Sequence, residues 1–277
     1  MTSPKVVQVA PGIYEIFMPL PMRPTIINVY LIDCHGAWVL IDTGMNTPES
    51  VKTLEAAKVP PMQMPEARAF FIRHGFPVDR FAPEGMRPSW FGSNQYSPST
   101  SPDTFIRDAD VIPIGDRRLE VIWTPGHSPG HCVIYLREEK VMIVGDHLLP
   151  KITPHVGLYP ESATNPLGDF LTSQRKVQAF DVELVLPAHG GVYNDHRHRA
   201  NQLIEHHRYR ENEILDLIKQ KPQTAFEVAQ QLFTDPQLPI FHVMAATFET
   251  LAHLEFAHLE GRARKTERND RILFQTV

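Results

Sequence analysis

The chain has 277 residues, of which 42% are hydrophobic and 21% charged, and its formal net charge is −5 with histidine neutral. This length suits one large domain, or a large domain with a small one, and the composition is typical of a soluble globular protein. The negative charge argues against bulk attraction to nucleic acid or anionic membranes. No apolar run approaches a membrane span or a signal peptide, and two cysteines make no disulfide framework. We therefore predict a cytoplasmic protein without a membrane partner.

The first 150 residues are predicted to form mainly strands and turns, because short runs rich in β-branched residues end at glycine, proline or polar residues. The predicted strands are 6–9, 13–17, 25–32, 37–41, 118–123, 132–136 and 140–144, with another at 183–186. Apolar residues along one face predict helices at 48–57 and 166–180. Pro65 near the first position and Glu66 in the first turn predict another helix at 65–73. Many prolines fall between residues 59 and 113, so we expect that stretch to be rich in loops.

The pattern becomes helical after about residue 196. Predicted helices cover 199–219, 224–232 and 240–260, and Thr224 with Glu227 forms a capping-box pattern at the start of the second. Two short strands around a turn follow, which is the order of elements in a winged helix. We therefore predict a first domain at 1–198 and a winged-helix-like domain at 199–277. Basic and acidic residues are equally numerous from 196 onward, so nucleic-acid binding is not favoured there.

Three motifs place metal-binding residue types directly after predicted apolar strands. His127 lies in Thr-Pro-Gly-His-Ser-Pro-Gly-His, Asp146 in Val-Gly-Asp-His and His189 in Pro-Ala-His-Gly-Gly. A catalytic metal site needs neutral imidazoles and a carboxylate converging from different strand ends, with an open position for water. We therefore predict that these three residues converge and bind metal. His131 and His147 flank them and are predicted to support the ligands rather than bind the metal.

Together with Ile-Asp-Thr-Gly at 41–44, these motifs resemble the metallo-β-lactamase superfamily over residues 5–195. The resemblance implies an α/β fold, in which two sheets pack face to face with helices outside as a four-layer αββα sandwich. It also implies that His127 binds a first metal, His189 a second, and Asp146 both as the catalytic carboxylate. Asp42 would support these ligands without binding metal. Zinc is expected, and iron or manganese would also suit histidine and aspartate.

The C-terminal part, including His-His-Arg-Tyr-Arg-Glu-Asn-Glu-Ile-Leu at 206–215, is similar to the lactamase-like protein 2 group within that superfamily. This similarity implies a hydrolase whose substrate is an ester, thioester, lactone or phosphodiester. The partner would then be a small molecule or RNA, and a homodimer remains open. The sequence does not name the substrate, because pocket loops vary with the chemistry.

The superfamily's His-x-His-x-Asp-His motif is not found in this chain, and His74 is the only histidine between His35 and His127. In one explanation, residues 73–79 are a decayed copy that keeps His74. In the other, which we prefer, the motif is absent and residues 62–74 belong to the helix that normally follows it. No apolar strand separates the predicted helices around residues 58–62, so a segment is missing there by natural deletion or by truncation.

The missing motif leaves several functions open. With only three ligands, we predict about one bound metal per subunit, or fewer, and an impaired hydrolase. The alternatives are a non-catalytic relative that binds a ligand or has a structural role, and a nucleic-acid-binding or nucleic-acid-processing protein that uses the winged helix.

Overall fold

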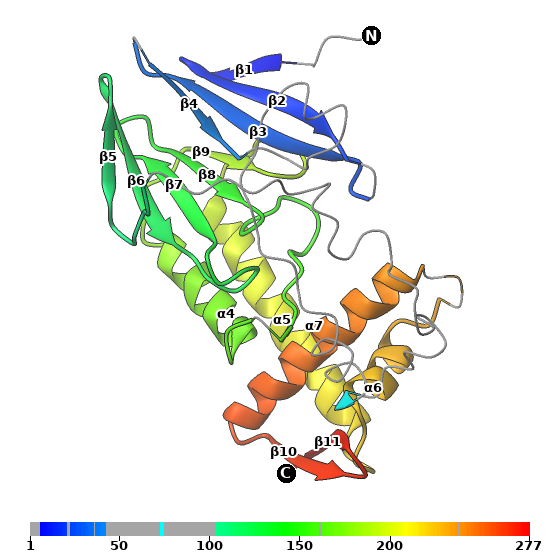
Figure 1. Ribbon diagram of the computed structural model, residues 1–277. Helices are drawn as coiled ribbons and strands as arrows, with labels where there is room; N and C mark the ends of the chain where they lie inside the picture. Colours follow the sequence, from blue (N-terminus) through cyan, green and yellow to red (C-terminus); the bar gives the residue numbers. More distant parts are fainter. Residues whose placement is uncertain are drawn as a thin grey trace.

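The computed structural model describes residues 6–20, 23–35, 37–42, 73–74, 104–160, 162–235, 237 and 239–277. Two sheets lie at one end of the molecule, and helices followed by a C-terminal hairpin lie at the other (Figure 1). The helices predicted at 48–57 and 65–73 lie outside the described residues, apart from Arg73, and so does the junction at 58–62.

The first sheet has four antiparallel strands in the order of the sequence. They are β1 (Val6–Ala10), β2 (Ile13–Pro19), β3 (Ile26–Asp33) and β4 (Trp38–Ile41). All four were predicted, and β2 is two residues longer than its prediction. These runs form strands because β-branched and aromatic side chains pack well on a pleated surface.

The second sheet has five strands, again in the order of the sequence. They are β5 (Val111–Ile114), β6 (Arg117–Trp123), β7 (Cys132–Leu136), β8 (Val141–Gly145) and β9 (Leu184–Pro187). Only β8 and β9 pair in parallel; the other neighbours are antiparallel. Two antiparallel steps separate β6 from β8, so β6, β8 and β9 run in one direction and end at one edge of the sheet. The sequence did not predict β5, which contains Pro113 and lies at the sheet edge, where proline is tolerated.

Both faces of the five-stranded sheet are covered. Val121 and Ile134 belong to the core between the two sheets, whereas their neighbours Ile122 and Val133 belong to the core beneath the helices. This alternation follows from the two-residue period of a strand, and it is why these strands are apolar on both faces. The α/β class with two packed sheets is confirmed. No helix of the described ranges covers the outer face of the four-stranded sheet, so the fourth layer of the expected sandwich is not among the described elements.

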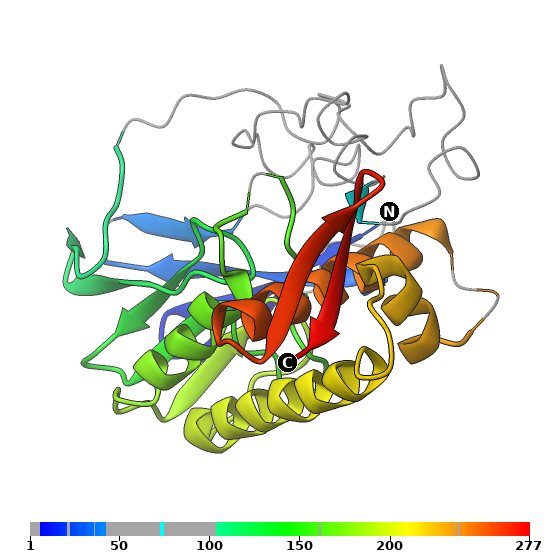
Figure 2. The ribbon, with the colours of Figure 1, turned by 90° about the horizontal axis from the view of Figure 1, so that it is seen from below.

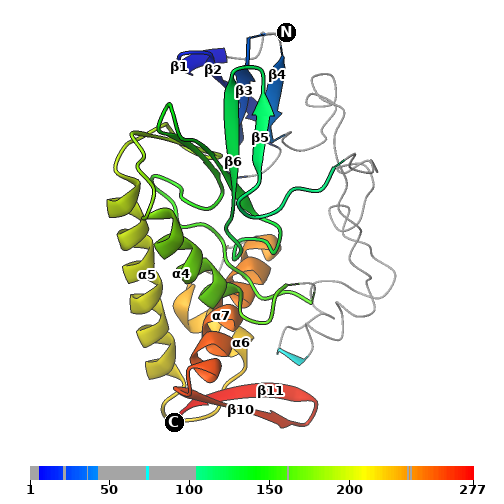
Figure 3. The same cartoon turned by 90° about the vertical axis from the view of Figure 1, so that its left-hand side faces the viewer.

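Helix α4 (Pro166–Val177) connects β8 to β9, and α5 (His196–Leu217) and α7 (Ile240–Leu259) pack beside it. The short α6 (Ala225–Leu232) and the hairpin of β10 (Ala263–Arg268) and β11 (Arg271–Thr276) complete the C-terminal part (Figure 3). The predicted order of elements, three helices followed by two strands, is therefore observed. Seen from below, the hairpin lies across α7 (Figure 2).

Helix starts follow local capping chemistry. Thr224 and Glu227 form the predicted capping box, in which each side chain accepts a hydrogen bond from the backbone N–H of the other. Helix α5 begins at His196, three residues before its prediction, because the Asp195 side chain caps the His198 N–H. The predicted domain boundary at 198/199 thus falls in the first turn of α5. No helix in the described ranges is long and apolar enough to cross a membrane.

Candidate metal centre

The three predicted ligands come together where β6, β8 and β9 end. Asp146 follows β8 and lies between the two histidines: its Oδ2 is 3.7 Å from His127 Nε2, and its Oδ1 is 3.3 Å from His189 Nε2. All three side chains remain partly exposed, between 13 and 32%. A small molecule can therefore reach the polar atoms of this group, which we call the strand-end trio (His127, Asp146 and His189).

Backbone carbonyls fix the orientation of both imidazoles. His127 Nδ1 lies 2.8 Å from the carbonyl oxygen of His155, and His189 Nδ1 lies 2.7 Å from that of Ile26. A carbonyl oxygen can only accept, so each Nδ1 must carry the proton. Nε2 of each ring therefore faces the carboxylate of Asp146, and in a neutral ring this nitrogen carries a lone pair.

This arrangement fits a divalent metal. Two lone pairs that face each other repel unless a proton or a cation lies between them, and an Nδ1–H bonded to a carbonyl is the usual support of a histidine that binds metal through Nε2. In the described residues, however, no group of three or more His, Cys, Asp or Glu side chains is arranged to hold a metal ion by itself. The three side chains of the trio are oriented to bind a metal ion, but by themselves they are too few to complete its coordination shell.

Two glycines let the ligand loops approach their neighbours. Gly126 precedes His127 with φ +137°, and a Cβ there would lie 2.4–2.8 Å from the backbone and Cβ of Phe170 in α4. Gly145 precedes Asp146 with φ +51°, and a Cβ there would meet His131 Nε2 at 2.7 Å. Larger residues at these positions would displace His127 or Asp146, which explains the glycine in each motif.

Two buried side chains of β3 support the loop that carries His189. The Asn28 amide donates to the carbonyls of Pro187 and Gly190 at 3.1 and 2.8 Å, and the Tyr30 hydroxyl donates to that of Pro187 at 2.7 Å. Burial, with the nearby Glu15, strongly raises the pKa of Tyr30, so its hydroxyl keeps the proton that it donates. The sequence analysis missed both residues; the only signal was an asparagine inside an apolar strand.

A small cavity of about 240 Å³ adjoins Asp146, and Asp42 and His131 are among its lining residues. Asp42 follows β4 with φ +68° and lines this cavity together with Asp146, and its predicted role as a supporting carboxylate stays a prediction. Burial lowers the pKa of His131 to about 3, and its Nδ1 lies 2.8 Å from Thr124 Oγ1. His131 is therefore neutral at physiological pH. His147 is fully buried and packs against His131 and Phe170.

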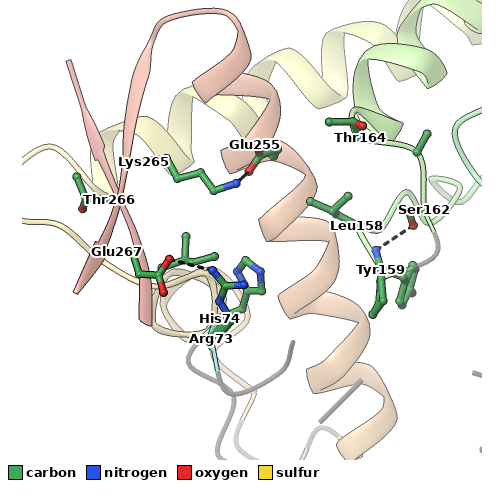
Figure 4. Close-up of a pocket in the computed structure, with 13 residues that line it drawn as sticks. Arg73, His74, Leu158, Tyr159, Ser162, Thr164, Glu255, Lys265, Thr266 and Glu267 are labelled. Carbon is green, nitrogen blue, oxygen red and sulfur yellow. Dashed lines mark hydrogen bonds and ion pairs between the residues drawn. The ribbon is translucent and has the colours of Figure 1, made fainter. Parts of the chain in front are cut away.

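His74 lies elsewhere. It lines a second cavity of about 810 Å³ that is also lined by residues of α7, of the hairpin and of 158–160 and 162–164, and Figure 4 shows it beside Arg73. Its carbonyl accepts from the Phe226 N–H at 3.2 Å, and Arg73 pairs with Glu267 at 2.9 Å. Burial, with Lys265 nearby, lowers the pKa of His74 to about 4. No described residue lines both cavities, so the structure places His74 apart from the trio.

Two parts of the chain match known protein families. Residues 66–189 match the family described as "Metallo-beta-lactamase superfamily", and residues 212–277 match "Metallo-beta-lactamase-like, C-terminal domain". The chain belongs to the metallo-β-lactamase superfamily. Proteins of this superfamily generally bind divalent metals such as zinc. The first match contains all three residues of the trio and ends at His189, and it begins after residues 41–44 and after the 58–62 junction.

Individual relatives extend the likeness to most of the chain. A solved metallo-beta-lactamase family protein from Thermus thermophilus superposes with a TM-score of 0.81 at 26% identity, covering 98% of this chain and all of the other. The "Beta-lactamase-like protein 2 homolog" of Caenorhabditis elegans is 24% identical over 75% of this chain and 71% of its own length. The "Acyl-coenzyme A thioesterase MBLAC2" of Gallus gallus is 30% identical over 43% of each chain. In two further curated relatives the match spans only 50 and 62% of their length.

Proposed function

We propose that this superfamily member is a metal-dependent hydrolase whose substrate is a thioester. The observation that carries the metal dependence is the strand-end trio, in which the Nε2 atoms of two histidines face one carboxylate at 3.3 and 3.7 Å. The choice of a thioester among ester, thioester, lactone and phosphodiester is supported by the chicken relative that is named an acyl-coenzyme A thioesterase.

Each residue of the trio has a proposed role. His127, Asp146 and His189 would hold the metal, with zinc proposed first and iron or manganese as alternatives. The bound metal would supply an activated water and positive charge for the oxyanion that forms during hydrolysis. The Asp146 oxygens lie between both imidazoles and can accept a proton from a water held there. Asp42 would hold the loop beside Asp146 in place.

The test compares one panel of substrates on the purified protein loaded with zinc. Thiol release from an acyl-coenzyme A is measured beside hydrolysis of an aryl ester, a lactone and an aryl phosphodiester. We expect the highest kcat/KM with the thioester, and loss of that activity in His127→Ala, His189→Ala and with a chelator. His198→Ala is the matched control, because His198 is an exposed histidine that bonds Gln202 on α5.

Two outcomes would overturn the proposal. Faster hydrolysis of another ester class than of the thioester would reject the substrate. No metal-dependent hydrolysis with any of the four substrates would reject catalysis and favour the non-catalytic alternative.

A further inference from the structure

The carbonyl that orients His127 comes from a loop that the C-terminal helix α7 holds in place. The His155 carbonyl accepts from His127 Nδ1 at 2.8 Å, yet His155 lies 28 residues further along the chain, in the connection between β8 and α4. This contact fixes which nitrogen of His127 faces Asp146. The position of the His155 carbonyl is therefore a condition for the geometry of the trio.

Three contacts attach this loop to α7. The His155 ring is bound on both sides: Nδ1 lies 3.5 Å from Glu249 Oε2, and Nε2 lies 2.6 Å from the Tyr159 hydroxyl. The Leu158 N–H donates to the carbonyl of Phe248 at 3.1 Å, and the Tyr159 ring packs on the Phe248 ring with centroids 4.6 Å apart. Side chain and backbone of the loop thus both depend on one turn of α7.

The hydrogen-bond roles in this chain of contacts are consistent. The Tyr159 hydroxyl donates to Nε2 of His155, and Nδ1–H of His155 then points to the carboxylate of Glu249. Burial raises the pKa of Tyr159, which keeps the phenol protonated. Burial also raises the pKa of Glu249, but His155 and His253 outweigh it and lower that pKa below its ordinary value. Glu249 is therefore ionised and accepts from His155 at neutral pH.

We infer that Glu249 is a positioning residue for the metal centre, acting through His155 on the ligand His127. It lies on α7, outside the segment 66–189 that matches the metallo-beta-lactamase superfamily. The C-terminal part then has a second role besides packing with the other helices: through His155, it helps to orient a metal ligand. The inference rests on the proposed function in that it treats His127 as a metal ligand.

Three variants of α7 test it. Glu249→Leu removes the acceptor for His155, Glu249→Gln keeps an acceptor oxygen, and Thr250→Val is the control. The Thr250 hydroxyl is buried without a hydrogen-bond partner among the described residues, so its loss leaves the loop contacts intact. The measured quantity is the dissociation constant for Zn²⁺, by competition with a chromophoric chelator, together with the visible spectrum of the Co²⁺-loaded protein.

Loss of an outer contact to a ligand typically weakens metal binding about 10- to 100-fold. We expect a loss of that size and an altered Co²⁺ spectrum in Glu249→Leu, a smaller loss in Glu249→Gln and no change in Thr250→Val. Tyr159→Phe, which removes only the hydroxyl at His155, should give a smaller loss of the same kind and is used if the leucine variant does not fold. Unchanged Zn²⁺ affinity in Glu249→Leu or Tyr159→Phe would overturn the inference.

A second measurement separates this inference from the proposed function. Long-range ¹H–¹⁵N NMR reports which ring nitrogen of His127 carries the proton, and it needs no metal. We expect the Nδ1–H form in the parent and a mixture of tautomers in Glu249→Leu. If the parent binds no metal, the proposed function fails, while this spectrum still decides the positioning role: an unchanged Nδ1–H form in Glu249→Leu would reject it.

Discussion

The loop that carries His189 should depend on two side-chain donors that share one acceptor. Asn28 and Tyr30 both donate to the carbonyl of Pro187, so either one alone still satisfies it. Tyr30→Phe removes the hydroxyl that donates to the carbonyl of Pro187 at 2.7 Å and also lies 3.3 Å from Glu15 Oε1. The loss of one buried hydrogen bond costs about 0.5–1.5 kcal/mol. Asn28→Ala removes two, but the carbonyl of Pro187 keeps Tyr30 and that of Gly190 can bind water, because Gly190 is exposed. We expect Asn28→Ala to cost about 1–3 kcal/mol.

The double variant should cost more than the sum of the two single variants. With both donors gone, the carbonyl of Pro187 loses its side-chain partners inside the protein, and a buried acceptor left unsatisfied costs a further 1–3 kcal/mol or so. The free energy of unfolding is measured by urea denaturation of the parent, both single variants and the double variant. We expect a coupling of about 1 kcal/mol or more.

A second cycle serves as the control. Tyr193→Phe removes a hydroxyl that donates to Leu148 at 2.8 Å and shares no acceptor with Asn28. Its effect and that of Asn28→Ala should add within about 0.5 kcal/mol. Equal additivity in both cycles would refute the shared-acceptor reasoning and show that each donor acts independently on the loop.

Metal content, a helix cap and the response to acid provide three further predictions. Elemental analysis of the purified protein should find about one metal per subunit or fewer, and His127→Ala or His189→Ala should lower that content; two tightly bound metals would contradict the shell counted above. Thr224→Ala removes the cap of α6 and should lower the free energy of unfolding by about 1 kcal/mol in urea, whereas an unchanged value would mean that the cap is dispensable. Burial lowers the pKa of His74 to about 4 and that of His207 to about 3, so the unfolded chain binds these protons first. Stability is then full above about pH 6.5 and falls as the pH drops toward 4; a Tm that stays constant from pH 7.5 to 5 would count against it.

The strand-end motifs and one helix cap could be predicted from the sequence, because each depends on residues that are close together in the chain. The motifs around His127, Asp146 and His189 combine an apolar strand with a tight loop, and both signals lie within a few residues. The capping box of Thr224 and Glu227 is equally local, and it was predicted and observed. The edge strand β5 escaped prediction, because Pro113 and its short length resemble a loop.

Only the tertiary structure decided what supports the site. Asn28 meets the loop of His189 across 159 residues or more, and His155 meets His127 across 28. Glu249, on helix α7 near the C-terminal end of the described residues, contacts the loop that contains His155. The sequence shows no pattern for such contacts, because they depend on how the sheets and helices pack rather than on the spacing of neighbouring residues. The sequence by itself therefore determined which residues are offered at the strand ends, whereas folding determined which nitrogen of each histidine faces Asp146.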